Sequence, residues 1–244
     1  MTPGAARGDG RRPEELRPAR LVPDFTEGPL ASVLAEMGRT RVLCTLSEQA
    51  GVPRWLEGSG RGWLTAEYSM LPGATQPRGE REATRGRPSG RSQEIQRLIG
   101  RSLRAVVDLG ALGPRTLYVD CDVLQADGGT RCASITGAWT ALALGLRRLR
   151  ERGALSRDPL VDAVAAVSAG IVGGRAVVDL AYEEDSRAEV DLNLVATGGG
   201  RLVEIQATGE RATFSPGELE AMNGLALRGI ARLVELQRAA LGAA

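Results

Sequence analysis

The segment TLYVDCDVLQADGGTR, residues 116–131, decides the fold of this chain. From Thr116 to Leu124, apolar and polar side chains alternate, which is the pattern of a half-buried strand. Asp127 to Arg131 then forms a glycine turn, and the Ala- and Gly-rich apolar run that follows, to Leu149, is typical of a helix packed closely on a sheet. A strand, a turn and a helix in this order, with alternating signals elsewhere, predict a mixed α/β fold.

The glycine turn also has the arrangement of an anion site. The first amides of a helix have no internal partner, and the helix dipole places partial positive charge there. Gly128 and Gly129 let the backbone approach a ligand, Thr130 can add a hydroxyl donor, and Arg131 adds a planar fork that suits phosphate oxygens. The alternative is a tight turn beside an arginine, and the local pattern does not separate the two.

Composition restricts the chemistry. The chain has 244 residues with 43% hydrophobic content, enough for one large domain or two small ones, and a net charge of only +1 excludes a polybasic nucleic-acid binder. There is no histidine, and all 31 basic residues are arginine. Ser-His and Cys-His nucleophiles, His-ligated zinc, a P-loop lysine and a Schiff-base lysine are therefore excluded. Catalysis must use carboxylates, arginine, backbone amides, hydroxyls or a bound metal.

The remaining global features predict a reduced, cytoplasmic protein. Cys44, Cys121 and Cys132 are scattered in apolar runs and are expected to be buried thiols. The N-terminus is polar, so no secretory signal is predicted, and no apolar run reaches the ~18 residues of a membrane span. Residues 1–12 are rich in Gly and Arg and are expected to form a disordered tail.

The first half of the chain predicts a hairpin, a strand, a loop and a helix. Short apolar runs, Leu30 to Glu36 and Arg41 to Ser47, flank a turn, and Trp63 to Met70 resembles another strand. A polar loop follows from Pro72 to Gly90, and Ser92 is the expected N-cap of a helix. Between residues 76 and 104 there are eight arginines against three glutamates, a net of +5. We interpret this stretch as an RNA or phosphate surface in preference to a solvated basic face.

The second half contains a candidate metal site. Two apolar runs, Val161 to Gly170 and Arg175 to Tyr182, predict a hairpin, and an acidic segment follows. Asp185 is expected at a bend, and Asp191 on the polar face of the next strand. Two carboxylates arranged in this way can hold Mg²⁺ through oxygens and water. The alternative, an acidic strand edge, is favoured by this stretch alone.

Five blocks, taken in order, resemble the ribonuclease PH family of phosphorolytic 3′→5′ exoribonucleases: Thr40 to Thr45, Gly62 to Tyr68, Gly90 to Arg101, Asp120 to Arg131 and Glu184 to Ser186. The resemblance extends from about Arg11 to Ala240. It implies an α/β fold of the α+β type, in which a single mixed-sheet domain, residues 13–240, has helices packed on the sheets. It also implies a homo-oligomer, a hexameric ring built as a trimer of dimers.

The implied activity is that of a tRNA nucleotidyltransferase. Such an enzyme uses inorganic phosphate as co-substrate to trim tRNA precursors from the 3′ end, and it releases nucleoside 5′-diphosphates. The reverse reaction adds nucleotides from nucleoside diphosphates. Residue by residue, the resemblance assigns phosphate binding to Arg91, Gly129, Thr130 and Arg131. It assigns catalysis and the binding of Mg²⁺ or Mn²⁺ to Asp185 and Asp191.

The expected RNA path is basic. The resemblance places Arg78 and Arg81 at subunit contacts and along the RNA, and Arg97 and Arg104 lie on polar faces of the predicted helix. One departure is Gly73, where family members often carry arginine. Two alternatives stay open: a hydrolytic nuclease that uses water in place of phosphate, and a non-catalytic RNA-binding ring subunit of an exosome-like assembly.

Overall fold

The first of two sheets is built from the N-terminal half of the chain. The computed structural model describes residues 7–242, apart from the side chains of Ala83 and Arg85. The strand order is β1-β2-β3-β5-β4, and every pairing is antiparallel except the parallel pair β4 and β5. The bounds are β1 (Ala19–Pro23), β2 (Ala31–Met37), β3 (Thr40–Ala50), β4 (Trp63–Met70) and β5 (Arg115–Gln125). The crossover from β4 to β5 contains α1 (Gly90–Arg104), which packs on β4.

The second sheet is fully antiparallel, in the order β7-β6-β8-β9. Its strands are β6 (Val164–Val172), β7 (Arg175–Val178), β8 (Val190–Thr197) and β9 (Leu202–Gly209). A single helical turn, α3 (Tyr182–Asp185), joins β7 to β8. Short 3₁₀ turns lie at Arg54–Leu56, Pro72–Ala74, Glu82–Arg85 and Leu109–Leu112.

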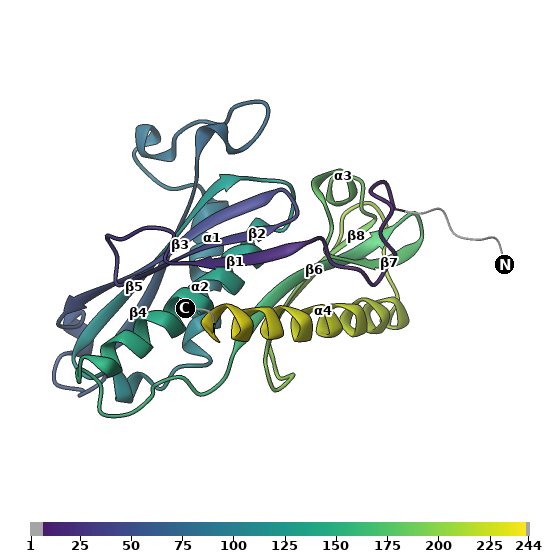
Figure 1. The fold of residues 1–244 in the computed structure, drawn as a ribbon. Helices are drawn as coiled ribbons and strands as arrows, with labels where there is room; N and C mark the ends of the chain where they lie inside the picture. The colour runs from purple at the N-terminus through teal and green to yellow at the C-terminus, as the bar shows by residue number, and fades with distance from the viewer. Residues whose placement is uncertain (1–6, 243–244) are drawn as a thin grey trace.

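Two long helices hold the sheets together. The helix α2 (Thr130–Glu151) packs on β2 and β3 of one sheet and on β6 of the other. The helix α4 (Pro216–Gly242) packs on β6, β7 and β1 and passes along both sheets in Figure 1. One hydrophobic cluster therefore includes side chains from both sheets. No helix within residues 7–242 has the length and apolar character that crossing a membrane requires.

Close packing of α2 depends on its glycines. A Cβ at Gly137 would lie 2.7 Å from Ala35 Cβ and 2.8 Å from Cys44 Sγ, closer than real atoms approach. The predicted close approach of this helix to a sheet is therefore confirmed, and so is the α/β fold with helices on mixed sheets. All three cysteines are buried and unpaired, as expected.

Two local predictions are wrong, and one strand was not predicted. The N-cap of α1 is Ser89, whose hydroxyl accepts a hydrogen bond from the Ser92 amide, so the helix begins at Gly90, two residues before the predicted cap. The strand β1, which was not predicted, forms by pairing with β2. Asp185 ends a helical turn in place of a bend.

The predicted disordered tail, residues 1–12, is partly outside the described residues. From Arg7 onward the segment is held in place, since Arg7 and Arg11 donate hydrogen bonds to Glu184 and to the Asp179 carbonyl. The expectation of a loose tail is therefore wrong for residues 7–12, because their arginines have acidic partners far along the chain.

Candidate active site

The glycine turn connects β5 to α2 in a left-handed backbone conformation. Gly128 has φ +79° and Gly129 has φ +68°, values that favour glycine. A Cβ at Gly128 would lie 2.6 Å from the Leu180 carbonyl oxygen, so the turn presses against the segment that precedes α3. The Tyr182 amide donates to the Asp127 carbonyl at 3.2 Å. The turn predicted to bind phosphate therefore contacts the acidic segment directly.

Thr130, the first residue of α2, is held by Tyr68 of β4. The two hydroxyl oxygens lie 2.9 Å apart in the buried interior. Burial raises the pKa of the Tyr68 hydroxyl, while the Thr130 hydrogen bond and the charges of Arg91 and Arg131 oppose that rise. The Tyr68 hydroxyl thus contacts Thr130 directly and experiences the charges of Arg91 and Arg131.

Arg131 is oriented by a network that the sequence did not reveal. Its Nη1 donates to Gln206 Oε1 on β9 at 2.8 Å. The Gln206 amide nitrogen in turn donates to Glu94 on α1 and to Glu204, each at 3.0 Å. Groups from β9 and α1 therefore fix the direction of the guanidinium, and no local pattern around Gln206 marks it for this role.

The two predicted aspartates lie close to each other and to these arginines. Burial, and then the charge of Asp185, raise the pKa of Asp191 to about 6, while Arg131 opposes the rise. Burial also raises the pKa of Asp185, and here Arg91 and Arg131 both act to lower it. Each carboxylate therefore experiences the charge of Arg131. The structure brings together the anion turn and the acidic pair, which come from separate parts of the sequence.

The acidic pair fits a hard divalent cation. Asp191 Oδ2 accepts a hydrogen bond from the Asn193 amide at 3.1 Å, whereas buried Oδ1 has no hydrogen-bond partner among the described residues. Carboxylate oxygens are the ligands that Mg²⁺ prefers, and Mg²⁺ usually keeps several waters and binds through one or two carboxylates. No larger cluster of His, Cys, Asp and Glu suited to a metal occurs within residues 7–242. The pair thus fits a cation that is completed by water or substrate oxygens.

A buried ion pair between Arg17 and Asp179 contacts the backbone of the glycine turn. Arg17 donates to the Asp127 carbonyl and contacts Gly128, and its Nη2 lies 2.6 Å from Asp179 Oδ1. The side chains of Arg17 and Asp179 are only 4% and 6% exposed. Burial lowers the pKa of Arg17, but the Asp179 carboxylate outweighs it and the net pKa is raised. The partners are 162 positions apart, so sequence patterns could not pair them.

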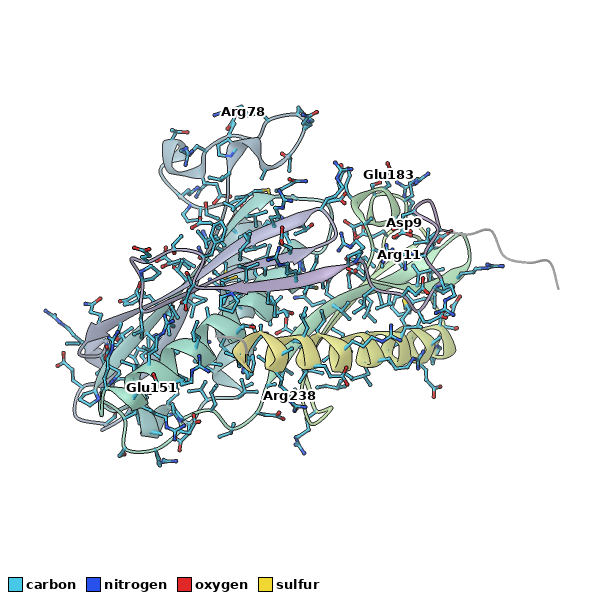
Figure 2. The ribbon with its side chains drawn as sticks, viewed as in Figure 1. Asp9, Arg11, Arg78, Glu151, Glu183 and Arg238 are labelled. Atoms are coloured by element: carbon cyan, nitrogen blue, oxygen red, sulfur yellow. The ribbon has the colours of Figure 1, made fainter. Side chains whose placement is uncertain are left out.

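Arg91, predicted to bind phosphate, and three of the four arginines predicted to bind RNA are exposed, whereas the fourth, Arg104, is partly buried. Arg91 is exposed in the first turn of α1, and Arg78 and Arg81 are exposed on the loop between β4 and α1; Figure 2 shows Arg78 at the top of this projecting loop. Arg97 is exposed on α1. Arg104 differs, because it donates to the Leu64 carbonyl at 3.0 Å and its guanidinium carbon lies 4.8 Å from the centre of the Trp63 ring.

The position of Arg104 separates it from the rest of the site. At 1.5 Å per residue, the helix places Arg104 about 20 Å from Arg91 along α1. Burial and the neighbouring Arg101 charge lower its pKa. The structure therefore gives Arg104 a packing contact at the far end of the helix, and its expected role in RNA binding stays a prediction.

Family models match most of the chain. The model described as 3′ exoribonuclease family, domain 1, matches residues 15–145, and domain 2 of the same family matches residues 162–229. The chain belongs to the 3′ exoribonuclease family. The first match ends inside α2, at residue 145, and the second begins at residue 162, just before β6 of the second sheet. That residues 13–240 act as a single domain stays a prediction.

Relatives of known name in this family are similar over nearly their full length. Ribonuclease PH of Mycolicibacterium smegmatis is 59% identical, covering 97% of this chain and 92% of the relative. Ribonuclease PH of Mycolicibacterium gilvum is 58% identical over 96% of this chain and 91% of the relative. The expected family and activity are confirmed: this member of the 3′ exoribonuclease family is an enzyme, a phosphorolytic 3′ exoribonuclease.

Solved structures extend the similarity in three dimensions. The Archaeoglobus fulgidus exosome with RNA bound to the active site has a TM-score of 0.79 at 26% identity, covering 94% of this chain and 92% of that one. Rice (Oryza sativa) Rrp46 also has a TM-score of 0.79, at 18% identity, covering 97% of this chain and 100% of that one, which supports the fold alone.

Proposed function

We propose that this enzyme trims the 3′ ends of tRNA precursors by phosphorolysis, at the site formed by Arg91, the turn Gly129 to Arg131, Asp185 and Asp191. The supporting observation is the gathering of charges: Arg131 acts on both carboxylates, and Arg91 acts on Asp185. An anion-binding turn beside an acidic pair suits a reaction in which two anions must meet.

Phosphate binding is the first task of the site. The free amides at the start of α2, the Thr130 hydroxyl and the two guanidinium groups are donors for phosphate oxygens. Because Gln206 and Tyr68 already orient Arg131 and Thr130, little reorganisation is needed when phosphate arrives. These residues hold the nucleophile in line with the terminal phosphodiester.

The chemical step exchanges one P–O bond for another. A phosphate oxygen forms a bond to the terminal internucleotide phosphorus, and the bond from that phosphorus to the 3′-oxygen of the preceding nucleotide breaks. The terminal nucleotide leaves as a nucleoside 5′-diphosphate, and the released 3′-oxygen takes a proton. Since a phosphoryl bond is conserved, diphosphates can extend RNA by the reverse reaction.

The acidic pair holds the metal in this scheme. Asp185 and Asp191 would bind Mg²⁺ or Mn²⁺, which supplies charge neutralisation at the phosphoryl and leaving oxygens. Arg91 and Arg131 themselves neutralise the charge of the incoming phosphate, and together with Thr130 they restrict the direction from which phosphate reaches the RNA. Arg78, Arg81 and Arg97 provide positive charge for the RNA backbone. We place the enzyme in the cytoplasm and expect it to assemble as a hexameric ring.

The test is a product analysis on a tRNA with a short 3′ extension. Phosphate-dependent release of nucleoside diphosphates is the expected result, and sulfate at equal ionic strength serves as the control. Release of nucleoside monophosphates in phosphate-free buffer would show a hydrolytic nuclease. Absence of any product, with RNA binding retained, would show a non-catalytic ring subunit.

A further inference from the structure

The helical turn α3, which bears Asp185, is poorly stabilised by its own sequence. Four residues form a single turn, and isolated turns of this length are unstable in water. Its N-cap is Ala181, which has no capping side chain, so Glu184 reaches back to accept the Ala181 amide at 3.0 Å. Contacts from outside α3 must therefore hold the turn in place.

The N-terminal segment supplies those contacts. Arg7 binds Glu184 with both arms of its guanidinium, Nε to Oε1 and Nη2 to Oε2, each at 2.6 Å. Arg11 adds a third contact, from Nη2 to Oε2 at 3.3 Å. The side chains of Arg7, Arg11 and Glu184 are 5%, 10% and 10% exposed. A bidentate ion pair whose side chains are so little exposed to solvent has a fixed geometry.

Arg7 also reaches the backbone before α3. It donates to the Val178 carbonyl at 2.8 Å and to the Asp179 carbonyl at 3.0 Å. One guanidinium thus links the end of β7 to the turn that carries Asp185. In Figure 2 the loop with Asp9 and Arg11 lies beside the turn that carries Glu183.

We propose that Arg7 is a positioning residue for phosphorolysis, and that it acts through Glu184 to fix the carboxylate of Asp185. Successive helical residues point about 100° apart, so clamping Glu184 sets the direction of its neighbour. The inference rests on the proposed function of Asp185. It gives the N-terminal segment a role in positioning Asp185, one of the two aspartates of the site.

The two halves of the site have different side-chain supports, although Arg7 and Arg11 also donate to the Asp179 backbone carbonyl. The glycine turn is held by Arg17 and Asp179, and α3 is held by Arg7 and Arg11. Loss of Arg7 should therefore disturb Asp185 while phosphate binding at the turn persists. This predicts a lower kcat and a higher Mg²⁺ requirement with an unchanged KM for phosphate.

The first experiment compares Arg7→Ala with Arg12→Ala. Arg12 is a matched control in the same segment, because its side chain is 71% exposed and pairs with Glu15 at the surface. For Arg7→Ala, kcat and Mg²⁺ affinity should fall by up to about 10-fold, the lower end of the effect of removing a direct partner of a metal ligand, because Arg7 acts on Asp185 through the neighbouring Glu184. Arg12→Ala should behave as the wild type. Equal kinetics of the two variants would overturn the proposal.

A second readout is independent of turnover. Hydrogen exchange on the RNA-free protein should accelerate at the Asp185 and Ser186 amides, which donate to the Ala181 and Tyr182 carbonyls at 2.9 Å. Amides of β5 should be unchanged. Uniform acceleration across the protein would indicate a general loss of stability and would overturn a local positioning role.

Chemical rescue gives a third measurement. Arg7 lines a cavity of about 650 Å³ together with Arg11, Arg175 and Glu184, so the guanidinium ion can enter where the side chain was removed. Low-millimolar guanidinium should restore part of the kcat of Arg7→Ala and leave Arg12→Ala unaffected. Failure of rescue with altered kinetics would favour a packing role and count against the proposal. A wild type without phosphorolysis would instead refute the proposed function.

Discussion

At the scale of single residues, the charge on Asp191 decides what the site can do. This carboxylate lies half-buried on β8 and has a like-charged neighbour in Asp185. Its Oδ1 is buried and accepts no hydrogen bond from the described residues. A buried carboxylate oxygen without a hydrogen-bond donor is unfavourable by itself, and it is well suited to contact a cation.

Asp191→Asn should abolish turnover while RNA still binds. The substitution keeps the shape of the side chain and removes the charge that would hold the metal. Since metal neutralisation contributes several kcal/mol to a phosphoryl-transfer barrier, we expect kcat to fall at least about 100-fold. Turnover and RNA binding should be measured together, with the surface variant Asp158→Asn as control. Survival of activity would show that the metal assignment is wrong.

The same residue predicts how stability depends on pH. The folded pKa of Asp191 is about 6, above its ordinary value, so the folded state binds an extra proton between about pH 4 and pH 6. The stability that this proton contributes is lost as pH rises through that window. At pH 7 the ionised carboxylate costs up to about 3 kcal/mol.

Metal-free Asp191→Asn should therefore melt at a higher temperature than the wild type at pH 7. The difference should shrink as the pH approaches 4, where both forms are neutral. Thermal unfolding in the presence of a chelator measures this directly. A wild type and variant with the same melting temperature at pH 7 would contradict the raised pKa.

Some residues of the site could be predicted from the sequence, and others could not. Motif positions such as Arg131 and Asp185 were recognisable because their residue types and order form blocks. Arg17, Asp179 and Gln206 were not, since each acts through a partner that only the folded chain brings near. Sequence patterns are local, whereas buried ion pairs and hydrogen-bond networks depend on tertiary distance.

At the scale of elements, α2 shows how glycine positions control packing. A side chain at Gly137 would meet Ala35 and Cys44 on rigid strands, whereas one at Gly224 in α4 would meet only the flexible end of Arg228, at 3.6 Å. Glycine lowers helix stability in both positions, but only Gly137 is needed for close approach.

Gly137→Ala should destabilise the protein by about 1–3 kcal/mol, because an extra methyl group overpacks the interface. Gly224→Ala should stabilise it by up to about 1 kcal/mol through helix propensity. Denaturant unfolding of the two variants tests the contrast within one fold. If both substitutions shifted the free energy of unfolding in the same direction, close packing of α2 would not explain the presence of glycine at position 137.

At this scale, elements specified by neighbouring residues could be predicted from the sequence, whereas elements held by distant residues could not. The strand β5 and the helix α2 were both predicted from local patterns. The strand β1 was missed, because its pairing with β2 and not its own sequence makes it a strand. The turn α3 was missed for the same reason, since distant arginines hold it.

At the scale of the whole molecule, positive charge is unevenly placed. Arg78 stands on a loop that projects from the body, far from Arg238 of α4 in the view of Figure 2. The loop starts beside the phosphate turn, because the Ala126 amide donates to the Ala74 carbonyl at 2.9 Å. Residues 76–104 carry eight arginines against three glutamates, whereas the whole chain has a net charge of +1, so positive charge is concentrated in this stretch.

Replacing Arg78 and Arg81 with alanine should weaken RNA binding and flatten its salt dependence. Each lost phosphate contact lowers the slope by about 0.7 on single strands. RNA affinity should be measured over a range of salt in the Asp191→Asn background, where no turnover is expected. Arg238→Ala is the matched control on the opposite side. An unchanged slope for the loop variant would exclude this loop from the RNA path.

The pairing of Arg17 with Asp179 has a consequence for biosynthesis. A ribosome releases the chain from its N-terminus, so Arg17 emerges long before the carboxylate that it needs. Until then the guanidinium has no acidic partner to fix it beneath the glycine turn, and Glu184 and Asp191 are also still to come. A nascent chain therefore cannot assemble a working site by stages. Nuclease activity should arise in one late event, when most of the polypeptide has left the ribosome and the RNA that encodes it has nearly been read.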